Sequence, residues 1–431
     1  MHFSENPLRK LLLPLLSLLS GVGMLVVGSG LLFSAVGLQT SAAKFSTVVT
    51  GLIMSAYFAG FVLGTYVCPM MIRSVGHIRA FAAMASVAST IPILHALWLN
   101  AWYWGALRLI TGICLVGLYL VVESWLAMVA QKHERGRVFA MYMAVSSLAL
   151  AMGQLLILVG DKLGFIPFAL VSILFSFALV PITLTPVSDP QTSSAPSFSL
   201  RKLIAISPIG VAGAIGSGLL SGALLSLGHV FGKGVGFSDT AIATFMAVTI
   251  LGGAIFQWPV GHLSDRYDRR WVLFWVCLAC AAVAGVGFEL ARDYEKFLVF
   301  LGVVYGGLAF TVYGLAVAHV NDMIEQDRVL EVTGGLLLLH GIGATIGPTL
   351  AGSVMYWLGP ESLMLYFSAV LLILAACVWY FSLGKVVMLA VGHPRQEYVV
   401  MGGGTPAAVQ MDPRSALDET GLGSGPDSRW R

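Results

Sequence analysis

Long apolar segments, separated by short polar stretches, follow one another along most of the chain. A helix needs about 20 mostly apolar residues to cross the hydrocarbon core of a bilayer, and twelve segments meet this requirement. We therefore predict an all-α membrane protein with twelve transmembrane helices. The predicted helices cover residues 11–36, 47–72, 79–99, 102–125, 138–160, 165–184, 204–228, 240–262, 271–291, 297–320, 332–356 and 361–384.

Two longer polar stretches divide the chain into parts. Residues 185–203 are rich in Pro, Ser and Thr, which is typical of a linker, and six predicted helices lie on each side of them. We expect an N-terminal six-helix bundle over residues 1–184 and a pseudo-symmetric C-terminal bundle over residues 204–384. The tail, residues 385–431, is polar and rich in Gly and Pro, so we expect it to be disordered. The first apolar run is long enough to span and shows no clear cleavage site, so we interpret it as a helix and not as a signal peptide.

The composition agrees with a lipid environment and narrows the chemistry. Hydrophobic residues make up 58% of the chain and charged residues 10%, whereas soluble proteins carry about 25% charged residues. The net charge of +3 gives no reason to expect a nucleic-acid partner. The cysteines lie in apolar runs, and the pair Cys277 and Cys280 has no second ligand pair nearby, so we expect neither a metal site nor a cofactor. The chain has no Gly-rich phosphate loop, which argues against ATP-driven transport.

Basic residues in the predicted loops give the orientation, because cytoplasmic loops carry an excess of Lys and Arg. On the side of the two termini lie Arg9, Lys10, Arg73, Arg79, Lys132, Arg135, Arg137, Arg201, Lys202, Arg266, Arg269, Arg270, Arg328 and Lys385. On the opposite side lie only Lys44, Lys162, Lys233, Arg292 and Lys296. We therefore predict a multi-pass protein of a bacterial inner membrane, with both termini, the linker and the tail in the cytoplasm.

The two halves contain similar sequence features. Residues 134–138 before the fifth predicted helix match residues 326–329 before the eleventh, and a further alignment places Gly153 opposite Gly347. Parallel six-helix repeats joined by a linker are one plan of secondary transporters, in which the substrate site lies between the halves near the midplane. The repeat therefore points to transport, with lipid and a small solute as the partners.

The loop between the eighth and ninth predicted helices carries the most specific motif. Residues 261–270 read GHLSDRYDRR, which resembles the G-x-x-x-D-R-x-G-R-R loop of the major facilitator superfamily. We expect Gly261 to allow close helix contact and Asp265 to accept from N–H groups at a helix start. Arginines of such a loop would hold helix ends and face the anionic leaflet; here they are Arg266, Arg269 and Arg270. The alternative is a basic loop with no role beyond orientation.

Other stretches extend this resemblance over about residues 8–385. Arg108 and Gly112 are similar to the R-x-x-x-G pattern of the superfamily, and residues 76–82, 121–126 and 134–138 resemble its poorly characterised YcaD-type branch. The resemblance implies the fold of the superfamily, with two six-helix bundles, and brings no substrate with it. In the first half Arg73 stands where the family has an acid, which puts the gating clamp of that half in doubt. The glycine–proline pattern of antiporters is missing from the fifth helix, which argues against a drug antiporter.

The predicted helix 102–125 holds two well-immersed charges, Arg108 and Glu123. They are 15 residues apart, about 22 Å along a helix, so they cannot pair, and Tyr119 lies between them on the same stripe. Charges inside a span usually have a task, and we interpret Glu123 as a proton-binding group and Arg108 as a contact for an anionic substrate group. The alternatives are an ion pair of Glu123 with Arg135 or Arg137, and a structural tie of Arg108 to backbone carbonyls.

Other polar residues inside predicted spans complete the set of candidates. His319 falls near the position that matches Glu123 and can change charge near physiological pH, so it is a second proton-coupling candidate. Tyr119, Gln154, Gln257, Tyr305 and His340 are candidate substrate contacts alongside Arg108. For each histidine the alternative is a neutral residue that hydrogen bonds within the packed helices.

These features predict a secondary active transporter that moves a small organic solute by alternating access, with protons as the coupling ion. The alternatives are an uncoupled facilitator and a transporter-like sensor or assembly protein that signals through its tail. No nucleophile–base pair is apparent, so we do not expect an enzyme. Nothing in the sequence demands more than a monomer.

Overall fold

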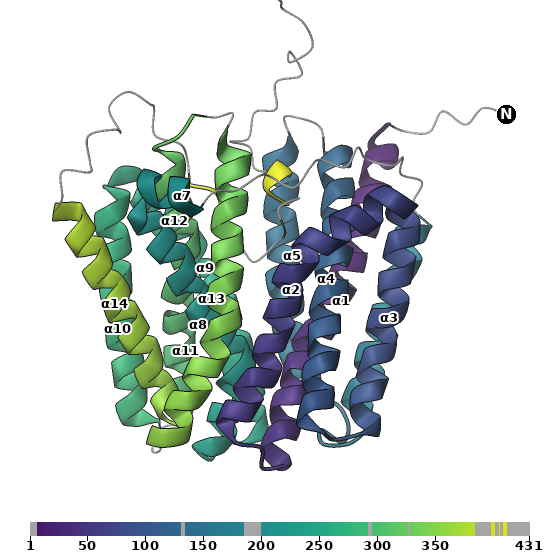
Figure 1. Cartoon of the computed structure of the whole chain (residues 1–431), viewed down its shortest axis with the longest axis horizontal. Coiled ribbons are helices and arrows are strands. Elements are labelled where there is room, and N and C mark those ends of the chain that lie inside the picture. Colours follow the sequence, from purple (N-terminus) through teal and green to yellow (C-terminus); the bar gives the residue numbers. More distant parts are fainter. Residues whose placement is uncertain are drawn as a thin grey trace, which may run out of the picture.

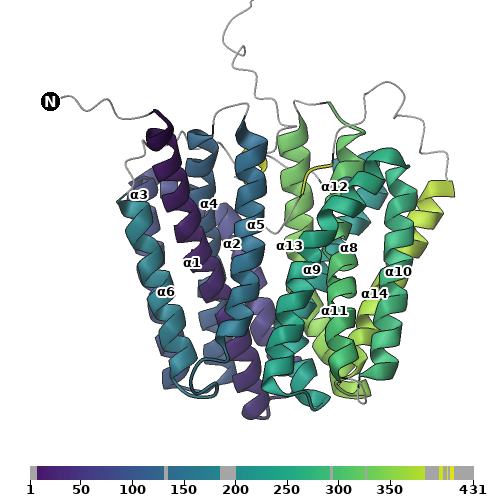
Figure 2. The same cartoon turned by 180° about the vertical axis from the view of Figure 1, so that it is seen from behind.

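The computed structural model describes residues 7–130, 134–184, 200–291, 295–325, 328–383, 398–400, 405 and 408–411. Within these ranges twelve spans are long and apolar enough to cross a membrane, which confirms the predicted all-α fold with twelve transmembrane helices. They form two bundles that stand side by side (Figures 1 and 2). The elements are α1 (Pro7–Ala42), α2 (Thr47–Val75), α3 (His77–Leu97), α4 (Ala101–Val129), α5 (Arg135–Leu156), α6 (Ile166–Thr183), α7 (Leu200–Ile206), α8 (Pro208–Gly234), α9 (Asp239–Arg266), α10 (Arg269–Leu290), α11 (Glu295–Ala309), α12 (Thr311–Asn321), α13 (Val329–Leu358), α14 (Ser362–Leu383) and the short 3-10 helix η4 (Ala408–Met411).

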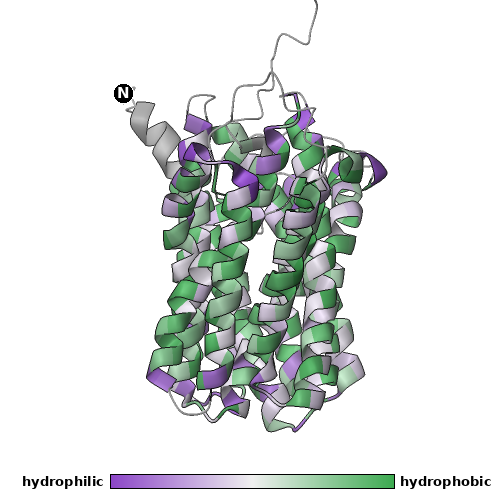
Figure 3. Cartoon of the chain, turned by 90° about the vertical axis from the view of Figure 1, so that its left-hand side faces the viewer, coloured by the Kyte–Doolittle hydropathy of each residue, from purple (hydrophilic) through white to green (hydrophobic). Residues whose placement is uncertain are grey.

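The two ends of the bundle are named here by the course of the first helix. The upper end is the end at which α1 begins, and the lower end is the end at which it finishes (Figure 1). Hydrophilic residues gather at both ends, and hydrophobic residues dominate the length between them (Figure 3). This distribution is that of helices whose middle parts face hydrocarbon.

Side-chain caps define where several helices begin. The hydroxyl or amide oxygens of four residues accept a backbone N–H from three positions further on, at 3.0–3.3 Å. Such bonds satisfy N–H groups that have no partner inside the helix. The four capping residues are Ser46 before α2, Asn100 before α4, Ser207 before α8 and Ser238 before α9.

The structure differs from the predicted elements at two places. The expected helix 297–320 is interrupted at Phe310, between α11 and α12, and the Nε2 of Gln257 donates to the Phe310 carbonyl at 3.2 Å. That bond gives a partner to a carbonyl beside the interruption. The second difference is α7, which begins inside the expected linker; residues 185–199 of that linker lie outside the described residues.

Equivalent glycine contacts hold each half together. A Cβ at Gly60 of α2 would lie 2.0 Å from the carbonyl oxygen of α4 Leu109, and one at Gly252 of α9 would lie 2.2 Å from that of α11 Val303. Only glycine permits such close approach of two helix backbones. Each half thus repeats the same helix pairing.

The two glycines that the sequence alignment matched also occupy equivalent places. Gly153 of α5 packs on the Val27 carbonyl of α1, and Gly347 of α13 packs on the Leu219 carbonyl of α8. The first and fifth spans therefore pair as the seventh and eleventh spans do. These contacts support the internal repeat inferred from the sequence.

Candidate functional site

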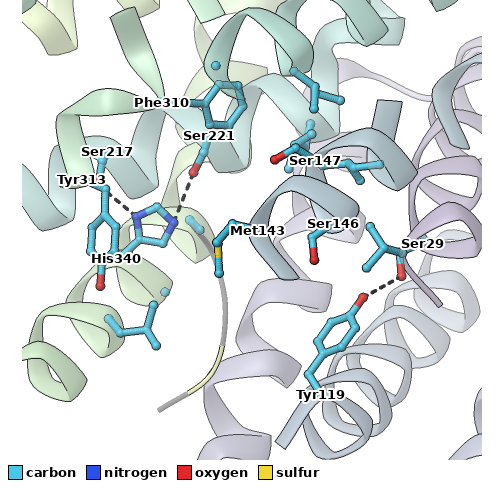
Figure 4. Close-up of a pocket in the computed structure, with 18 of the residues that line it drawn as sticks. Ser29, Tyr119, Met143, Ser146, Ser147, Ser217, Ser221, Phe310, Tyr313 and His340 are labelled. Atoms are coloured by element: carbon cyan, nitrogen blue, oxygen red, sulfur yellow. Dashed lines mark hydrogen bonds between the residues drawn. The ribbon is translucent and has the colours of Figure 1, made fainter. Parts of the chain in front are cut away.

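A cavity of about 400 Å³ lies between the two bundles. Its wall is mostly apolar, and none of the described residues that line it is Asp, Glu, Lys or Arg. The polar and aromatic groups come from both halves (Figure 4). They are Ser29 and Phe33 of α1, Tyr57, Phe58, Phe61 and Thr65 of α2, Tyr119 of α4, Tyr142, Ser146 and Ser147 of α5, Ser217 and Ser221 of α8, Gln257 of α9, Phe310, Tyr313 of α12 and His340 of α13.

The C-terminal half presents an imidazole held by two hydroxyls. Ser217 Oγ lies 2.9 Å from His340 Nδ1, and Ser221 Oγ lies 3.4 Å from His340 Nε2 (Figure 4). The two serines are four residues apart on α8, so they share one face of that helix. The Tyr313 ring lies 4.9 Å from the imidazole, centroid to centroid. This cluster therefore offers hydroxyl groups beside two stacking surfaces.

The N-terminal half presents a second pair of hydroxyls. Tyr119 Oη lies 3.2 Å from Ser29 Oγ (Figure 4). Ser29 itself donates to the Leu25 carbonyl at 2.9 Å, so Tyr119 is the donor of the shared bond. Ser146 and Ser147 of α5 line the same side of the cavity. The wall thus combines hydroxyls and aromatic rings without a charge.

Three of the six predicted substrate contacts line the cavity, namely Tyr119, Gln257 and His340. Gln154 does not, because it is fully buried between α1 and α5, where its amide accepts from Ser34 at 2.9 Å and donates to the Gly30 carbonyl at 3.3 Å. Amides inside a span need such partners, and Gln154 finds both of them on α1 and none in the cavity wall.

Two further predicted contacts lie behind the wall. Tyr305 is buried against Phe367, with ring centroids 5.0 Å apart, and does not line the cavity. Arg108 is 1% exposed, and its guanidinium stacks on the rings of Phe33 and Tyr57 at 4.5 and 4.6 Å. Both rings line the cavity and Arg108 does not, so the rings separate the charge from the solute space.

Arg108 is held there by stacking and not by the backbone ties proposed as the alternative. Its Nε and Nη2 have no hydrogen-bond partner among the described residues. A guanidinium over aromatic faces gains about 2 kcal/mol or more when desolvated. The neighbouring helix α2 can approach closely because Gly112 has no Cβ; a Cβ there would lie 2.0 Å from the Tyr57 carbonyl oxygen. The R-x-x-x-G pattern thus places a fixed positive charge one layer outside the cavity.

Glu123 is fully buried near the upper end of α4. Tyr142, which lines the cavity, donates to its Oε1 at 2.5 Å. The Thr405 N–H donates at 3.2 Å and the Ala408 N–H at 3.1 Å, both to Oε2, and the Thr405 hydroxyl donates to the same oxygen. No ion pair joins Glu123 to Arg135 or Arg137, all three of which lie in described parts of the chain. The ion-pair alternative is therefore not the arrangement of this structure.

His319 and the motif of residues 261–270 lie together at the upper end of the C-terminal half. His319 is 8% exposed, does not line the cavity, and is near Asp268. The buried Arg269 donates to Asp322 at 2.7 Å and lies 3.1 Å from Asp265. The motif thus joins the α9–α10 turn to the end of α12 through one arginine.

Asp268, and not Asp265 as expected, caps the helix that follows the motif. Asp268 accepts from the Arg270 N–H at 3.0 Å, because α9 continues to Arg266 and places Asp265 within the helix. The Arg270 guanidinium donates to Asp268 at 2.6 Å and holds the pKa of that carboxyl below its ordinary value. The contact therefore persists at neutral pH and is lost only when acid protonates Asp268. The remaining motif arginine, Arg266, is exposed.

The halves are joined directly at the lower end. Thr47 of α2 donates to the Gly352 carbonyl of α13 at 2.7 Å, and Ser55 and Thr349 share a bond of 2.8 Å. Asp239 at the start of α9 pairs with Lys162 of the N-terminal half at 3.0 Å. These contacts close the lower end of the cavity in this structure.

Replacing Asp239 with asparagine is expected to loosen this closure. The pair is partly exposed, so its loss should cost about 1 kcal/mol, which is roughly a fivefold shift in the equilibrium between closed and open lower ends. Spin labels at Val159→Cys and Trp357→Cys, one in each half, would report the distance between the lower ends. The control is Asp161→Asn, an acid at the same end whose described bond is to the Leu163 N–H of its own loop. An unchanged distance distribution in Asp239→Asn would contradict the role given to the pair.

Most of the cavity wall could not be predicted from the sequence. Apolar and hydroxyl side chains occur throughout membrane helices, so Phe33, Tyr57 or Tyr313 could not be separated from packing residues. The one usable signal was the i, i+4 pair of Ser217 and Ser221, which places two hydroxyls on one helix face.

Comparisons with known proteins agree with this architecture. A family model described as Major Facilitator Superfamily matches residues 206–397. An uncharacterised MFS-type transporter YcaD of Salmonella newport (strain SL254) is 28% identical over 350 residues, which are 79% of this chain and 89% of the relative. The same figures hold for the protein of that name from Salmonella typhi.

Solved structures share the fold at low sequence identity. The nucleoside transporter NupG superposes with a TM-score of 0.72 at 13% identity, covering 86% of this chain and all of that one. A D-xylose–proton symporter gives a TM-score of 0.65 at 14% identity, covering 88% of this chain and 98% of that one. A bacterial homologue of the human lysosomal transporter Spinster, in an inward-facing and occupied conformation, gives a TM-score of 0.71 at 15% identity, covering 88% of this chain and 98% of that one.

Proposed function

We propose that the chain is a membrane transporter of the major facilitator superfamily, and that it carries a small, neutral, amphipathic organic solute across the membrane together with protons. The observation that carries the proposal is the uncharged cavity between the halves, with a buried carboxylate connected to its wall through Tyr142. Alternating access would move the halves about this cavity.

The chemistry of the wall supports a neutral solute. A charged solute would lose its hydration without meeting an opposite charge, which costs several kcal/mol. Aromatic faces and hydroxyls suit a molecule with a flat or apolar part and several hydroxyl or amide groups. The structural neighbours include a nucleoside transporter and a pentose symporter by name, and solutes of those two kinds fit this description. An anionic solute, which the sequence position of Arg108 suggests, does not fit this uncharged wall.

The proton site that we propose is Glu123 with Tyr142. A carboxyl group in a dry site can exchange its proton when the site opens to water, and its charge then changes the cost of burying it. Tyr142 joins the carboxylate to the cavity by one hydrogen bond, so a solute that displaces Tyr142 would also disturb the carboxylate. This link would couple solute binding to protonation. Neither Glu123 nor His319 lines the cavity, but Glu123 is joined by a hydrogen bond to the lining residue Tyr142, so we place the proton site at Glu123.

We propose that the upper end faces the cytoplasm of a bacterium, in agreement with the excess of basic residues at that end. The lower end, closed by contacts between α2 and α13, would then face the outside. The cavity is complete within one chain, so a monomer suffices for transport.

A thermal-shift screen tests the solute class. Purified protein in detergent would be heated with neutral nucleosides, sugars and amides, and with organic acids and amines as charged counterparts. A solute present at 100 times its Kd should add about 2.7 kcal/mol to stability. We expect neutral compounds to stabilise the protein and their charged counterparts not to. Stabilisation only by acids or amines would contradict the proposal.

Two tyrosines provide a matched test of the binding wall. Tyr119→Phe removes a hydroxyl that lines the cavity, and Tyr305→Phe removes a buried hydroxyl that does not. A lost hydrogen bond to the solute should weaken binding by about 1 kcal/mol, or roughly fivefold. Titration of the best screened solute should show this loss for Tyr119→Phe and wild-type affinity for Tyr305→Phe. Equal affinities in both variants would place the solute elsewhere.

A further inference from the structure

Part of the tail lies inside the protein. Although the tail was expected to be disordered, Thr405 and Met411 are fully buried and Ala408 is 4% exposed. The short helix η4 lies near the upper end between the two bundles (Figure 1), where it touches α4 and α5 of one half and α13 of the other. The expectation fails at these residues because their backbone groups and apolar side chains find partners between the halves.

On the N-terminal half, the tail hydrogen bonds to the Glu123 carboxylate. Among the described residues, three of the four groups that donate to this carboxylate belong to the tail, namely the N–H and hydroxyl of Thr405 and the N–H of Ala408. Hydrogen bonds to a charged group contribute more than those between neutral groups. The contact is therefore a specific one between a buried carboxylate and one short peptide segment.

On the C-terminal half, Tyr398 of the tail contacts α9 and α12. The Tyr398 N–H donates to Asp265 at 2.9 Å, and the Tyr398 hydroxyl donates to the cavity residue Gln257. Gly261 and Gly314 leave room for the ring, because a Cβ at either would lie within 2.4 Å of a Tyr398 atom. The motif glycine Gly261 thus accommodates a tail side chain, and Val400 follows as part of the cavity wall.

We propose that the described tail residues, 398–400, 405 and 408–411, act as an internal ligand that closes the upper end of the cavity and holds the transporter at rest. It bridges the halves, takes three of the bonds to Glu123, and takes the Gln257 amide oxygen. The lower end is closed by direct contacts between the halves, so with the tail in place neither end is open. The tail would have to leave before the halves could exchange conformations. That the tail also blocks proton exchange at Glu123 rests on the proposed function of Glu123. Closure of the upper end does not rest on it.

The proposal is tested by access of a reagent to the cavity. Ser147→Cys, in the cavity wall, would be reacted with a membrane-impermeant maleimide in nanodiscs, where both ends face water. We expect a chain ending at Glu397 to react at least about tenfold faster than the full chain, because even one bond to a charged group is worth that factor. Protein without the introduced cysteine would correct for native thiols, and Val159→Cys at the lower end should react equally in both chains.

Point variants keep the test independent of truncation. Thr405→Pro removes the N–H and the hydroxyl that reach Glu123, whereas Thr405→Ser keeps both. We expect fast labelling in the first and slow labelling in the second, and a peptide with the sequence of residues 398–411 should slow labelling of the truncated chain. Equal rates in the full and truncated chains would overturn the proposal, as would slow labelling in Thr405→Pro. The assay needs neither solute nor proton gradient, so its outcome is separate from that of the proposed transport function.

Discussion

Replacing Glu123 with glutamine is expected to abolish the response of transport to a pH gradient. With one proton per cycle, a pH difference of one unit supplies about 1.4 kcal/mol and can sustain about a tenfold accumulation of solute. Glutamine has a similar shape and cannot change its charge, so the ratio should fall to about one. Uptake of the solute identified by thermal shift, measured in proteoliposomes with an imposed pH gradient, would give the accumulation ratio for the unmodified protein and for Glu123→Gln.

Exchange of solute between the two sides is the control for this substitution. Exchange needs binding and conformational change and no net proton movement, so Glu123→Gln should keep it. Loss of exchange as well would mean that the substitution damages the fold or the cavity. Persistent accumulation in Glu123→Gln would mean that another group carries the proton, and would contradict the role given to Glu123.

Replacing Gly112 with alanine is expected to cause a large loss of stability. The added Cβ would lie 2.0 Å from the Tyr57 carbonyl oxygen and 2.7 Å from the Phe61 nitrogen. Both are backbone atoms of α2, so the helix itself must move, which costs about 1–3 kcal/mol. Thermal melting in detergent should show a clearly lower transition, and solute affinity should fall because Tyr57 lines the cavity.

Gly105 offers the matched control on the same helix. A Cβ at Gly105 would meet no atom within 4 Å, so Gly105→Ala should leave the melting transition unchanged or raise it slightly through helix propensity. If Gly112→Ala melted like Gly105→Ala, the close contact of α2 and α4 would not be a determinant of stability.

The fold could be predicted because the bilayer imposes one rule on every span. Apolar length alone identified the twelve helices, and the alignment of Gly153 with Gly347 matched two positions that the structure shows to be equivalent. The interruption at Phe310 was missed because no proline or polar run marks it in the sequence. The Phe310 carbonyl there accepts from the Gln257 amide, which lies 53 residues away.

The site was predicted only in part. Charge inside a span identified Glu123 and Arg108, yet burial behind Phe33 and Tyr57 was needed to see that Arg108 does not reach the solute space. The tail contact could not be predicted from the sequence, because Thr405 is 282 residues from Glu123 and polar tails have no periodic pattern. Sequence therefore indicated which groups are unusual, and only the arrangement of helices shows what they face.

The most direct test of proton-coupled transport of a neutral solute is the proton movement that accompanies uptake. Proteoliposomes without an imposed gradient would receive the neutral solute in a weakly buffered medium that contains a pH-sensitive dye. We expect the medium to become more alkaline as solute enters, and Glu123→Gln to abolish this change while exchange continues. Solute uptake by the unmodified protein with no change in pH would contradict coupling and would identify the protein as an uncoupled facilitator.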